Sequence, residues 1–223
     1  MPRKTPKPAI DDRLLDTAID QFGRKGLEGA STRAIATAAD TAMSSITYHY
    51  GGKEGLYLAA ARRIAGQIAQ RFEAAMADAA EPDALSPAAA LEQILGMADA
   101  FLRILLSPES AQWARFIVHE QMEPTEGFTI LWDQFMGRIT GRFVKLVVRA
   151  ADGACKPAEA RVRAVTLFGQ ILVFRVARAA ALRITGWNDI GSAEAAEIRR
   201  VVHAQVRAIL ASLVAVTERS PAR

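Results

Sequence analysis

Residues 44–57, SSITYHYGGKEGLY, concentrate hydrogen-bonding and charged side chains in a chain that is otherwise rich in aliphatic residues. The three tyrosines of the protein lie here, together with a histidine, a lysine and small hydroxyl side chains. These groups donate and accept hydrogen bonds, but they form neither a metal-ligand cluster nor a nucleophile paired with a base. The segment is therefore better suited to contacting a polar surface than to catalysing a reaction.

Helical periodicity divides this segment into two faces. The predicted inward stripe consists of Met43, Ile46 and Tyr50. The opposite face and its flanks carry the polar side chains of Ser44, Ser45, Thr47, Tyr48 and His49. Slim hydrogen-bonding side chains let a helix approach a surface closely, and the DNA major groove, about 12 Å wide, admits a helix.

Candidate phosphate-binding groups lie on both sides of this helix. Ser31 is a predicted N-cap for a short helix that begins with Thr32 and Arg33, and a helix N-terminus favours an anion. Lys53 adds a positive charge at the start of the following helix. Two short helices, a tight turn and flanking phosphate donors are typical of a helix-turn-helix. Each feature alone is more often an ordinary solvated surface, and only their combination within one small unit favours nucleic-acid binding.

Apolar residues recur at intervals of three and four along the whole chain, which predicts an all-α fold. Gly and Pro residues separate about nine helices. Their approximate ranges are 10–25, 32–39, 44–50, 53–80, 88–105, 108–121, 124–150, 157–184 and 193–217. We expect residues 1–9 to be a mobile basic arm, residues 10–53 a three-helix DNA-binding domain, residues 54–217 a helical ligand-binding and dimerisation domain, and residues 218–223 a tail.

The composition limits the class of protein. Hydrophobic residues make up 51% of the chain and charged residues 23%, as in a typical globular protein. No apolar run approaches the roughly 20 residues of a membrane span, and no hydrophobic segment follows the basic N-terminus as in a secretory signal. The single cysteine, Cys155, excludes an intramolecular disulfide and a cysteine-built zinc site. We therefore expect a cytoplasmic protein with no membrane segment, cofactor or metal site, and the net charge of +4 permits a nucleic-acid partner.

The segment LLDTAIDQFGRKGLEGASTRAIATAADTAMSSITYHYGGKEGLY resembles the DNA-binding domain of the TetR family of transcriptional regulators. The shared pattern is a first helix ending in F-x-x-x-G, a T-x-x-I-A-x-x-A segment, and a recognition helix followed by K-E-x-L. The resemblance implies DNA contacts from Thr32, Arg33, Ser44, Ser45, Thr47, Tyr48 and His49, and a phosphate contact from Lys53. The segments HEQMEPTEGFTILWDQF and GQILVFRVARAAALRITGW are similar to the C-terminal domain of the CecR-like branch of that family.

Three positions depart from the family pattern. Asp40 replaces the usual glycine, Ala42 the usual serine, and Thr47 a frequent tyrosine. Because Asp tolerates a left-handed turn better than most residues, we expect the turn to form. Thr47 changes which base edges the helix can read.

The predicted body contains two further candidate surfaces. Aromatic and methionine residues interleaved with polar ones indicate either plain core or a small-molecule pocket, and the resemblance implies a pocket. The candidate pocket residues are Phe101, Trp113, Phe116, His119, Glu120, Trp132 and Arg175. The last two predicted helices carry apolar residues on two faces, which either close the monomer's core or form a four-helix dimer interface; the resemblance favours the dimer.

We therefore expect a homodimeric repressor that binds a pseudo-palindromic operator in double-stranded DNA and is released by a small-molecule effector. Two other classes are weighed against it. An all-α enzyme lacks support, because the sequence has no glycine-rich phosphate loop and no recognisable nucleophile–base pair. A helical partner-binding adaptor without a nucleic-acid role would have the same composition as a regulator, so this alternative stays open.

Overall fold

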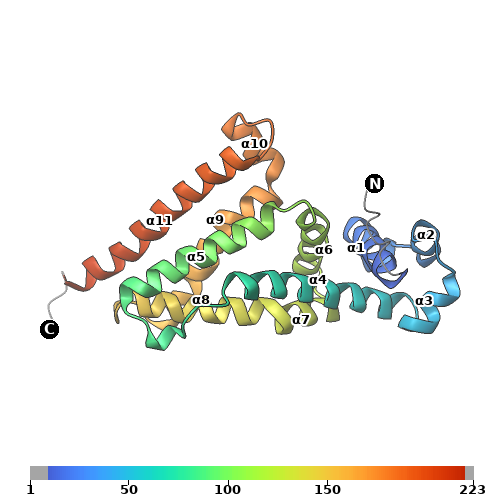
Figure 1. The fold of residues 1–223 in the computed structure, drawn as a ribbon, viewed down its shortest axis with the longest axis horizontal. Coiled ribbons are helices and arrows are strands. Elements are labelled where there is room, and N and C mark those ends of the chain that lie inside the picture. The colour runs from blue at the N-terminus through green and yellow to red at the C-terminus, as the bar shows by residue number, and fades with distance from the viewer. Residues whose placement is uncertain (1–9, 219–223) are drawn as a thin grey trace, which may run out of the picture. The chain divides into compact units, whose positions relative to one another are not determined.

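The computed structural model describes residues 10–218, and every regular element in that range is helical (Figure 1), which confirms the predicted all-α class. The chain forms two compact units. The first comprises residues up to Gln67 together with Ala111–Phe135, and the second comprises Ile68–Ser110 and the residues from Met136 onward. The predicted basic arm, residues 1–9, and residues 219–223 of the predicted tail lie outside the described residues. The predicted domain boundary at residue 53 stays a prediction.

The first unit begins with the three helices expected from the sequence. They are α1 (Ile10–Gly29), α2 (Thr32–Ala38) and α3 (Met43–Tyr50), and α2 packs on both of the others. Helix α1 is interrupted at Gly26, whose φ of 69° places it in the left-handed region, directly after the predicted end of the first helix at residue 25. Leu14, Phe22 and Ile35 are each at most 1% exposed and form the centre of this small core.

The first unit also contains part of α4 (Lys53–Ala75), most of α6 (Ser110–Met122), and α7 (Glu126–Leu131). Helices α1 and α6 approach closely at Gly23, where an added Cβ would lie 3.2 Å from the backbone nitrogen of Phe116. Tyr57 of α4 stacks on Phe116 with ring centroids 4.7 Å apart, and meets Phe22 of α1 edge to face at 4.9 Å. Aromatic packing therefore joins α1, α4 and α6.

A fully buried carboxylate lies beside this aromatic cluster. Glu120 is 0% exposed, and its Oε1 accepts hydrogen bonds from the Tyr57 hydroxyl and, at 2.8 Å, from the Thr125 hydroxyl. Its Oε2 accepts from the Thr125 backbone N–H at 3.0 Å. Gly127 leaves room for the network, because an added Cβ would lie 3.0 Å from both Glu120 and Tyr57. Hydrogen bonds of this kind make it possible to bury a carboxylate.

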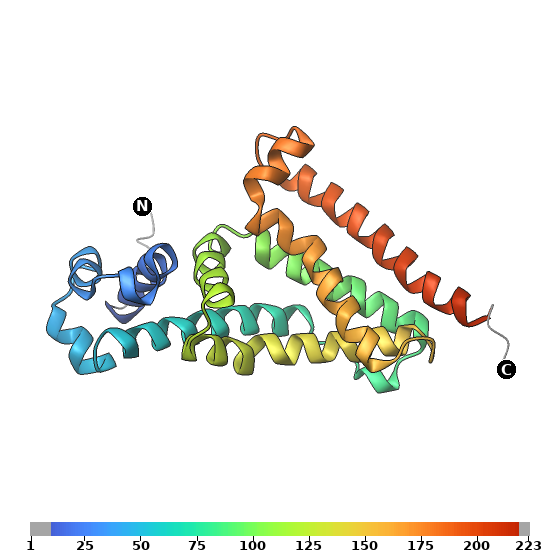
Figure 2. The same ribbon diagram turned by 180° about the vertical axis from the view of Figure 1, so that it is seen from behind.

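The second unit is built around α5 (Pro87–Leu106), which contacts α8 (Gly137–Ala150), α9 (Pro157–Val176) and α11 (Ser192–Glu218) (Figure 2). A short 3-10 turn, η1 (Pro82–Ala84), precedes α5. Asp99 of α5 anchors α11, since it accepts hydrogen bonds from Arg199 at 2.9 Å and lies 2.7 Å from Nε2 of His203.

Two predicted helices are divided in the structure. The predicted helix 124–150 forms α7, the π-helical segment η2 (Trp132–Met136) and α8. The predicted helix 157–184 is bent by 88° into α9 and α10 (Arg178–Thr185), and the break at Ala177 contains neither proline nor glycine. Arg175 donates to the carbonyls of Leu105 and Ser107 at the end of α5, a contact just before the bend.

None of the described helices is by itself long and apolar enough to cross a membrane, and only the bent pair α9–α10 reaches that length and composition when its two parts are combined.

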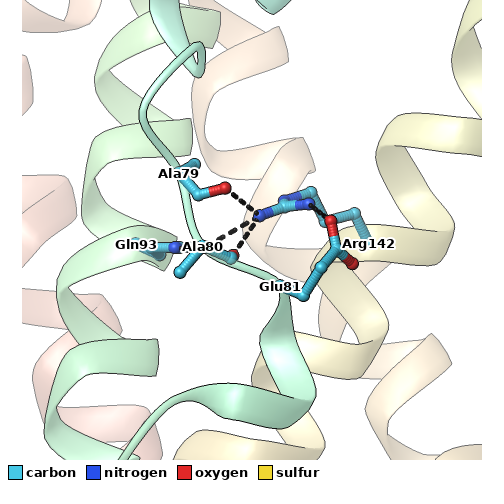
Figure 3. Close-up of polar contacts among 5 residues, drawn as sticks. All are labelled: Ala79, Ala80, Glu81, Gln93 and Arg142. Carbon is cyan, nitrogen blue, oxygen red and sulfur yellow. Dashed lines mark hydrogen bonds and ion pairs between the residues drawn. The ribbon is translucent and has the colours of Figure 1, made fainter.

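Arg142 of α8 holds the connection between α4 and α5 (Figure 3). Its Nη2 donates to the carbonyl of Ala80 at 2.5 Å and to Oε1 of Gln93 at 3.2 Å, and its Nη1 donates to Glu81 at 3.2 Å. Gln93 in turn donates to the Ala80 carbonyl at 2.9 Å. The guanidinium therefore replaces solvent as the partner of backbone groups that no helix satisfies.

Replacing Arg142 by Met should lower the free energy of unfolding by about 1–3 kcal/mol, because it removes the guanidinium donor to the Ala79 carbonyl and one of the two donors to the Ala80 carbonyl. Urea denaturation measures the change. The matched control is Arg138→Met, which removes an exposed pair with Glu73 and should change stability by less than about 0.5 kcal/mol. Equal effects of the two substitutions would contradict this role for Arg142.

Replacing Tyr57 by Phe should make the free energy of unfolding less dependent on pH in the alkaline range. Burial raises the pKa of Tyr57, and the hydrogen bond with Glu120 and its charge raise it further. Because the folded-state pKa lies above the usual value of about 10, the contribution of the neutral hydroxyl is complete below about pH 10 and is lost as the pH rises further.

The measurement is urea denaturation at about pH 8 and about pH 10.5, for the wild type, Tyr57→Phe and the exposed control Tyr48→Phe. The wild type and the control should lose more stability between the two pH values than Tyr57→Phe does. The same loss in all three proteins would show that Tyr57 does not carry this dependence.

Candidate nucleic-acid interface

Helix α3 has one anchored side and one exposed side. Ile46 is 1% exposed, whereas Tyr48 is 85% exposed, and Ser44, Thr47 and His49 are also exposed. Tyr50 is half-buried, and burial, with a smaller effect of the charge of Asp11, raises its pKa. The predicted inward positions of Ile46 and Tyr50 therefore agree with the structure.

Met43 differs from the expectation. The helical periodicity predicts Met43 on the inward stripe, but it is 52% exposed. It is the first residue of α3, at the open end of the helix where the chain leaves the preceding turn, so the buried stripe does not extend to it. The buried stripe of α3 is consequently shorter than the periodicity indicated.

The exposed side of α3 contains a compact pair of rings. Tyr48 and His49 meet edge to face with ring centroids 4.9 Å apart. Ser45, at the edge of this face, is half-buried. Hydroxyl, imidazole and phenol groups thus lie together on one face, where each can donate or accept a hydrogen bond.

The start of α2 has the predicted cap. The Ser31 hydroxyl accepts a hydrogen bond from the Ala34 N–H at 3.4 Å. Arg33 is exposed, and Thr32 is half-buried. Both lie in the first turn of α2, where backbone N–H groups have no partner within the helix.

The turn between α3 and α4 depends on glycine. Gly51 and Gly52 have φ angles of 74° and 119°, which side chains rarely adopt. Gly55 packs directly against the carbonyl of Tyr50, and an added Cβ would overlap that oxygen. The end of α3 is therefore placed closely against the start of α4.

Lys53 has a structural contact that the sequence did not predict. Its Nζ donates to the carbonyl of Glu28 at 2.8 Å, which joins the end of α1 to the start of α4. A shallow hollow of about 240 Å³ lies beside it, lined by Leu27, Glu28, Gly51, Lys53 and Glu54. An ammonium group has three donors, so this contact leaves others for a phosphate oxygen.

The turn between α2 and α3 adopts the left-handed conformation expected for Asp40, whose φ is 52°. Arg13 of α1 contacts this turn. Long-range contacts of this kind carry no local sequence signal, which is why Arg13 was not among the predicted residues.

The seven candidate pocket residues fall in both units. Five of them, Trp113, Phe116, His119, Glu120 and Trp132, belong to the first unit, and Phe101 and Arg175 belong to the second. Trp113, Phe116 and Glu120 are buried, whereas Trp132 is 46% exposed and stacks with Phe128. The His119 ring packs on Gly26, where its Cε1 would lie 2.8 Å from an added Cβ.

The polar members of this candidate set have partners within the protein. Glu120 is satisfied by Tyr57 and Thr125, and Arg175 by the end of α5. Phe101 packs on Phe168 with ring centroids 5.2 Å apart. A groove of about 480 Å³ in the second unit is lined by Asp99, Leu102, Arg103, Leu106, Ser107, Ala195, Ala196 and Arg199, and includes none of the seven.

Metal ligands are not clustered in the described part of the chain. Residues 10–218 contain no group of three His, Cys, Asp or Glu side chains that could hold an ion. Cys155 is 2% exposed, and burial raises the pKa of its thiol.

Exposed valines line one side of α9. Val162, Val165, Val173 and Val176 are between 44% and 72% exposed, and their spacing places them on a single face of the helix. We call these four residues the α9 valine face. Val201 of α11 is also 38% exposed.

Comparison with known proteins agrees with this architecture. Residues 14–60 match the family model for bacterial regulatory proteins of the TetR family, and residues 87–213 match the C-terminal domain of the HTH-type transcriptional dual regulator CecR. The CecR protein of Shigella flexneri is 31% identical over 207 residues, covering 90% of this chain and 91% of that protein.

Solved structures show the same fold at lower identity. A TetR-like regulator from Rhodococcus sp. RHA1 has a TM-score of 0.60 and 18% identity, covering 93% of this chain and 99% of its own. AibR, crystallised with isovaleryl coenzyme A and operator DNA, has a TM-score of 0.63 and 17% identity, covering 88% of this chain and 97% of its own. With an N-terminal helix-turn-helix and a matching C-terminal domain, the chain belongs to the TetR family of bacterial DNA-binding transcriptional regulators, in the group with a CecR-type C-terminal domain.

Proposed function

We propose that this regulator is a homodimeric repressor that binds a pseudo-palindromic operator through α3 and is released by a small molecule. The observation that best supports the DNA-binding role of α3 is the contrast between its two sides, with Ile46 1% and Tyr48 85% exposed. A helix anchored on one side leaves its other side free to enter a major groove. Family membership favours this class over an enzyme or an adaptor.

The proposed contacts separate into two kinds. Thr32, Arg33 and Lys53 bind phosphates and set the register of the protein on the duplex. Base edges are contacted by Ser44, Ser45, Thr47, Tyr48 and His49. Threonine at position 47 is shorter than the tyrosine frequent in the family, so we expect its neighbours Tyr48 and His49 to make the longer contacts.

The proposed dimer uses α9 and α11. The α9 valine face exposes branched apolar side chains that a monomer would leave in water, at a cost of roughly 25 cal/mol per Å². Two copies of a helix pair form a four-helix interface with two-fold symmetry. A dimer that binds the two half-sites of an operator has its two recognition helices in successive major grooves, about 34–36 Å apart.

The proposed response to a small molecule acts on the DNA-binding state. A ligand favours release only if it binds the released conformation better than the DNA-bound one. The seven candidate pocket residues stay a prediction from the sequence. AibR, which has the same fold, was crystallised with isovaleryl coenzyme A and operator DNA. A regulator of this fold that binds both a small molecule and DNA is therefore a reasonable model for the proposal. We place the protein in the cytoplasm, where it has access to chromosomal DNA.

The direct test of the function is an electrophoretic mobility-shift titration with the DNA that flanks the gene. A repressor of this kind should select one site, and its affinity should fall steeply as salt rises from about 50 to 200 mM, because phosphate contacts release counterions. Binding without site preference, or no binding, would contradict the proposal.

The Tyr48→Ala variant should keep its fold and its oligomeric state but lose operator selectivity by about 1–3 kcal/mol, because the ring is 85% exposed and lies on the face proposed to contact DNA. Fluorescence anisotropy with operator and scrambled duplexes gives the ratio of affinities. Arg138→Met serves as the control for loss of an exposed side chain elsewhere. An unchanged ratio for Tyr48→Ala would count against the role of α3.

The Val165→Glu variant should dissociate the dimer, because Val165, 72% exposed, lies within the α9 valine face and a buried unpaired charge is costly. Light scattering coupled to size-exclusion chromatography reports the mass. The control Met122→Glu introduces the same charge at a residue that is 77% exposed in the first unit, and it should leave the mass unchanged. A dimeric Val165→Glu variant would exclude this face as the interface.

A further inference from the structure

The turn between α2 and α3 has the hydrogen bonds of a Schellman motif with an aspartate at the glycine position. The N–H of Asp40 bonds to the Thr37 carbonyl at 3.1 Å, and the N–H of Thr41 bonds to the Ala36 carbonyl at 3.0 Å. Asp40 is left-handed, with φ of 52°. Glycine occupies this position without strain, whereas any residue with a Cβ is disfavoured there.

Helix α3 also begins without a side-chain cap. Its N-cap is Ala42, which forms no side-chain hydrogen bond to the first turn. Only four residues, 39–42, connect α2 to α3. The direction of α3 therefore depends on the conformation of this turn.

Arg13 of α1 supplies a support from outside the turn. Its Nη2 donates to the carbonyl of Asp40 at 3.2 Å and lies 3.4 Å from the carboxylate Oδ2. The Arg13 side chain is 32% exposed and that of Asp40 is 88% exposed. One guanidinium nitrogen thus contacts both the backbone and the side chain of the left-handed residue.

We propose that Arg13 is a positioning residue for the recognition helix, which holds the Asp40 turn in its left-handed conformation and so fixes α3 for DNA binding. The pair takes the place of the glycine that the family pattern usually has at position 40. The inference rests on the proposed function of α3. It assigns Arg13 no contact with DNA.

A double-mutant cycle tests this role. The variants are Arg13→Met, Asp40→Gly and the double variant, with Arg24→Met as the control for loss of a charge on α1. Arg13→Met should weaken operator binding on the order of three- to tenfold, because binding falls with the fraction of molecules in the competent conformation. In the Asp40→Gly background the same substitution should cost less than about twofold, because glycine adopts the turn without support.

The alternative is that Arg13 binds a phosphate directly. In that case Arg13→Met would weaken binding equally in both backgrounds. It would also reduce the slope of log affinity against log salt concentration by about one. Equal losses in both backgrounds would overturn the proposal. A loss confined to the Asp40 background, with an unchanged salt slope, would support it.

Hydrogen exchange of the free protein separates this inference from the proposed function. The amides of Thr41 and Ser45 are bonded within the turn and at the start of α3. Arg13→Met should speed their exchange on the order of three- to tenfold when Asp40 is present, and less than about twofold when glycine replaces it. Unchanged exchange in both backgrounds would overturn the proposal, whatever the protein binds. If exchange changes as expected but no operator is found, the proposed function fails and the role of Arg13 in the turn holds.

Discussion

An isolated helix of eight residues is unstable in water, because it forms too few hydrogen bonds to offset the entropy lost on nucleation. Helix α3 has this length, so it exists only through its contacts with the rest of the first unit. Ile46 provides the buried contact, and the turns at both ends set its direction. The polar face can remain exposed because the opposite side is held. The proposed DNA binding depends on that anchoring.

The two turns use different chemistry for the same purpose. The turn after α3 has consecutive glycines with positive φ, the close approach of Gly55 to Tyr50, and the bond from Lys53 to Glu28. The turn before α3 has an aspartate in the left-handed region and a guanidinium from α1. Tyr57 lies one turn beyond Lys53 on α4, in the buried network with Glu120. The start of α4 is therefore fixed at the recognition helix and also within the core of the first unit.

The sequence predicted the elements more fully than the contacts between them. Local signals identified the glycine at position 26, the Ser31 cap, the α3–α4 turn and the inward side of Ile46, because each depends on a few neighbouring residues. The bend at Ala177 and the π-helical segment at Trp132 lacked such signals, since the apolar periodicity continues through both.

Long-range partners were equally inaccessible from the sequence. Glu120 was a candidate ligand residue, but its partner Tyr57 is 63 positions away, and Arg13 and Asp40 are 27 apart. The aromatic residues of the candidate pocket could not be divided between the two units from periodicity alone, because core and cavity linings share the same composition. The hydrogen bonds of Glu120 and Arg175 in the structure identify their structural roles, which the sequence did not indicate.

The most direct test of the anchored recognition helix is selection of bound duplexes from random-sequence DNA, followed by sequencing. The account predicts enrichment of an inverted repeat whose half-sites are centred about 10 base pairs apart, or a multiple of one helical turn, as two symmetric α3 helices require. Recovery of no enriched sequence by a protein that is folded and dimeric would contradict it.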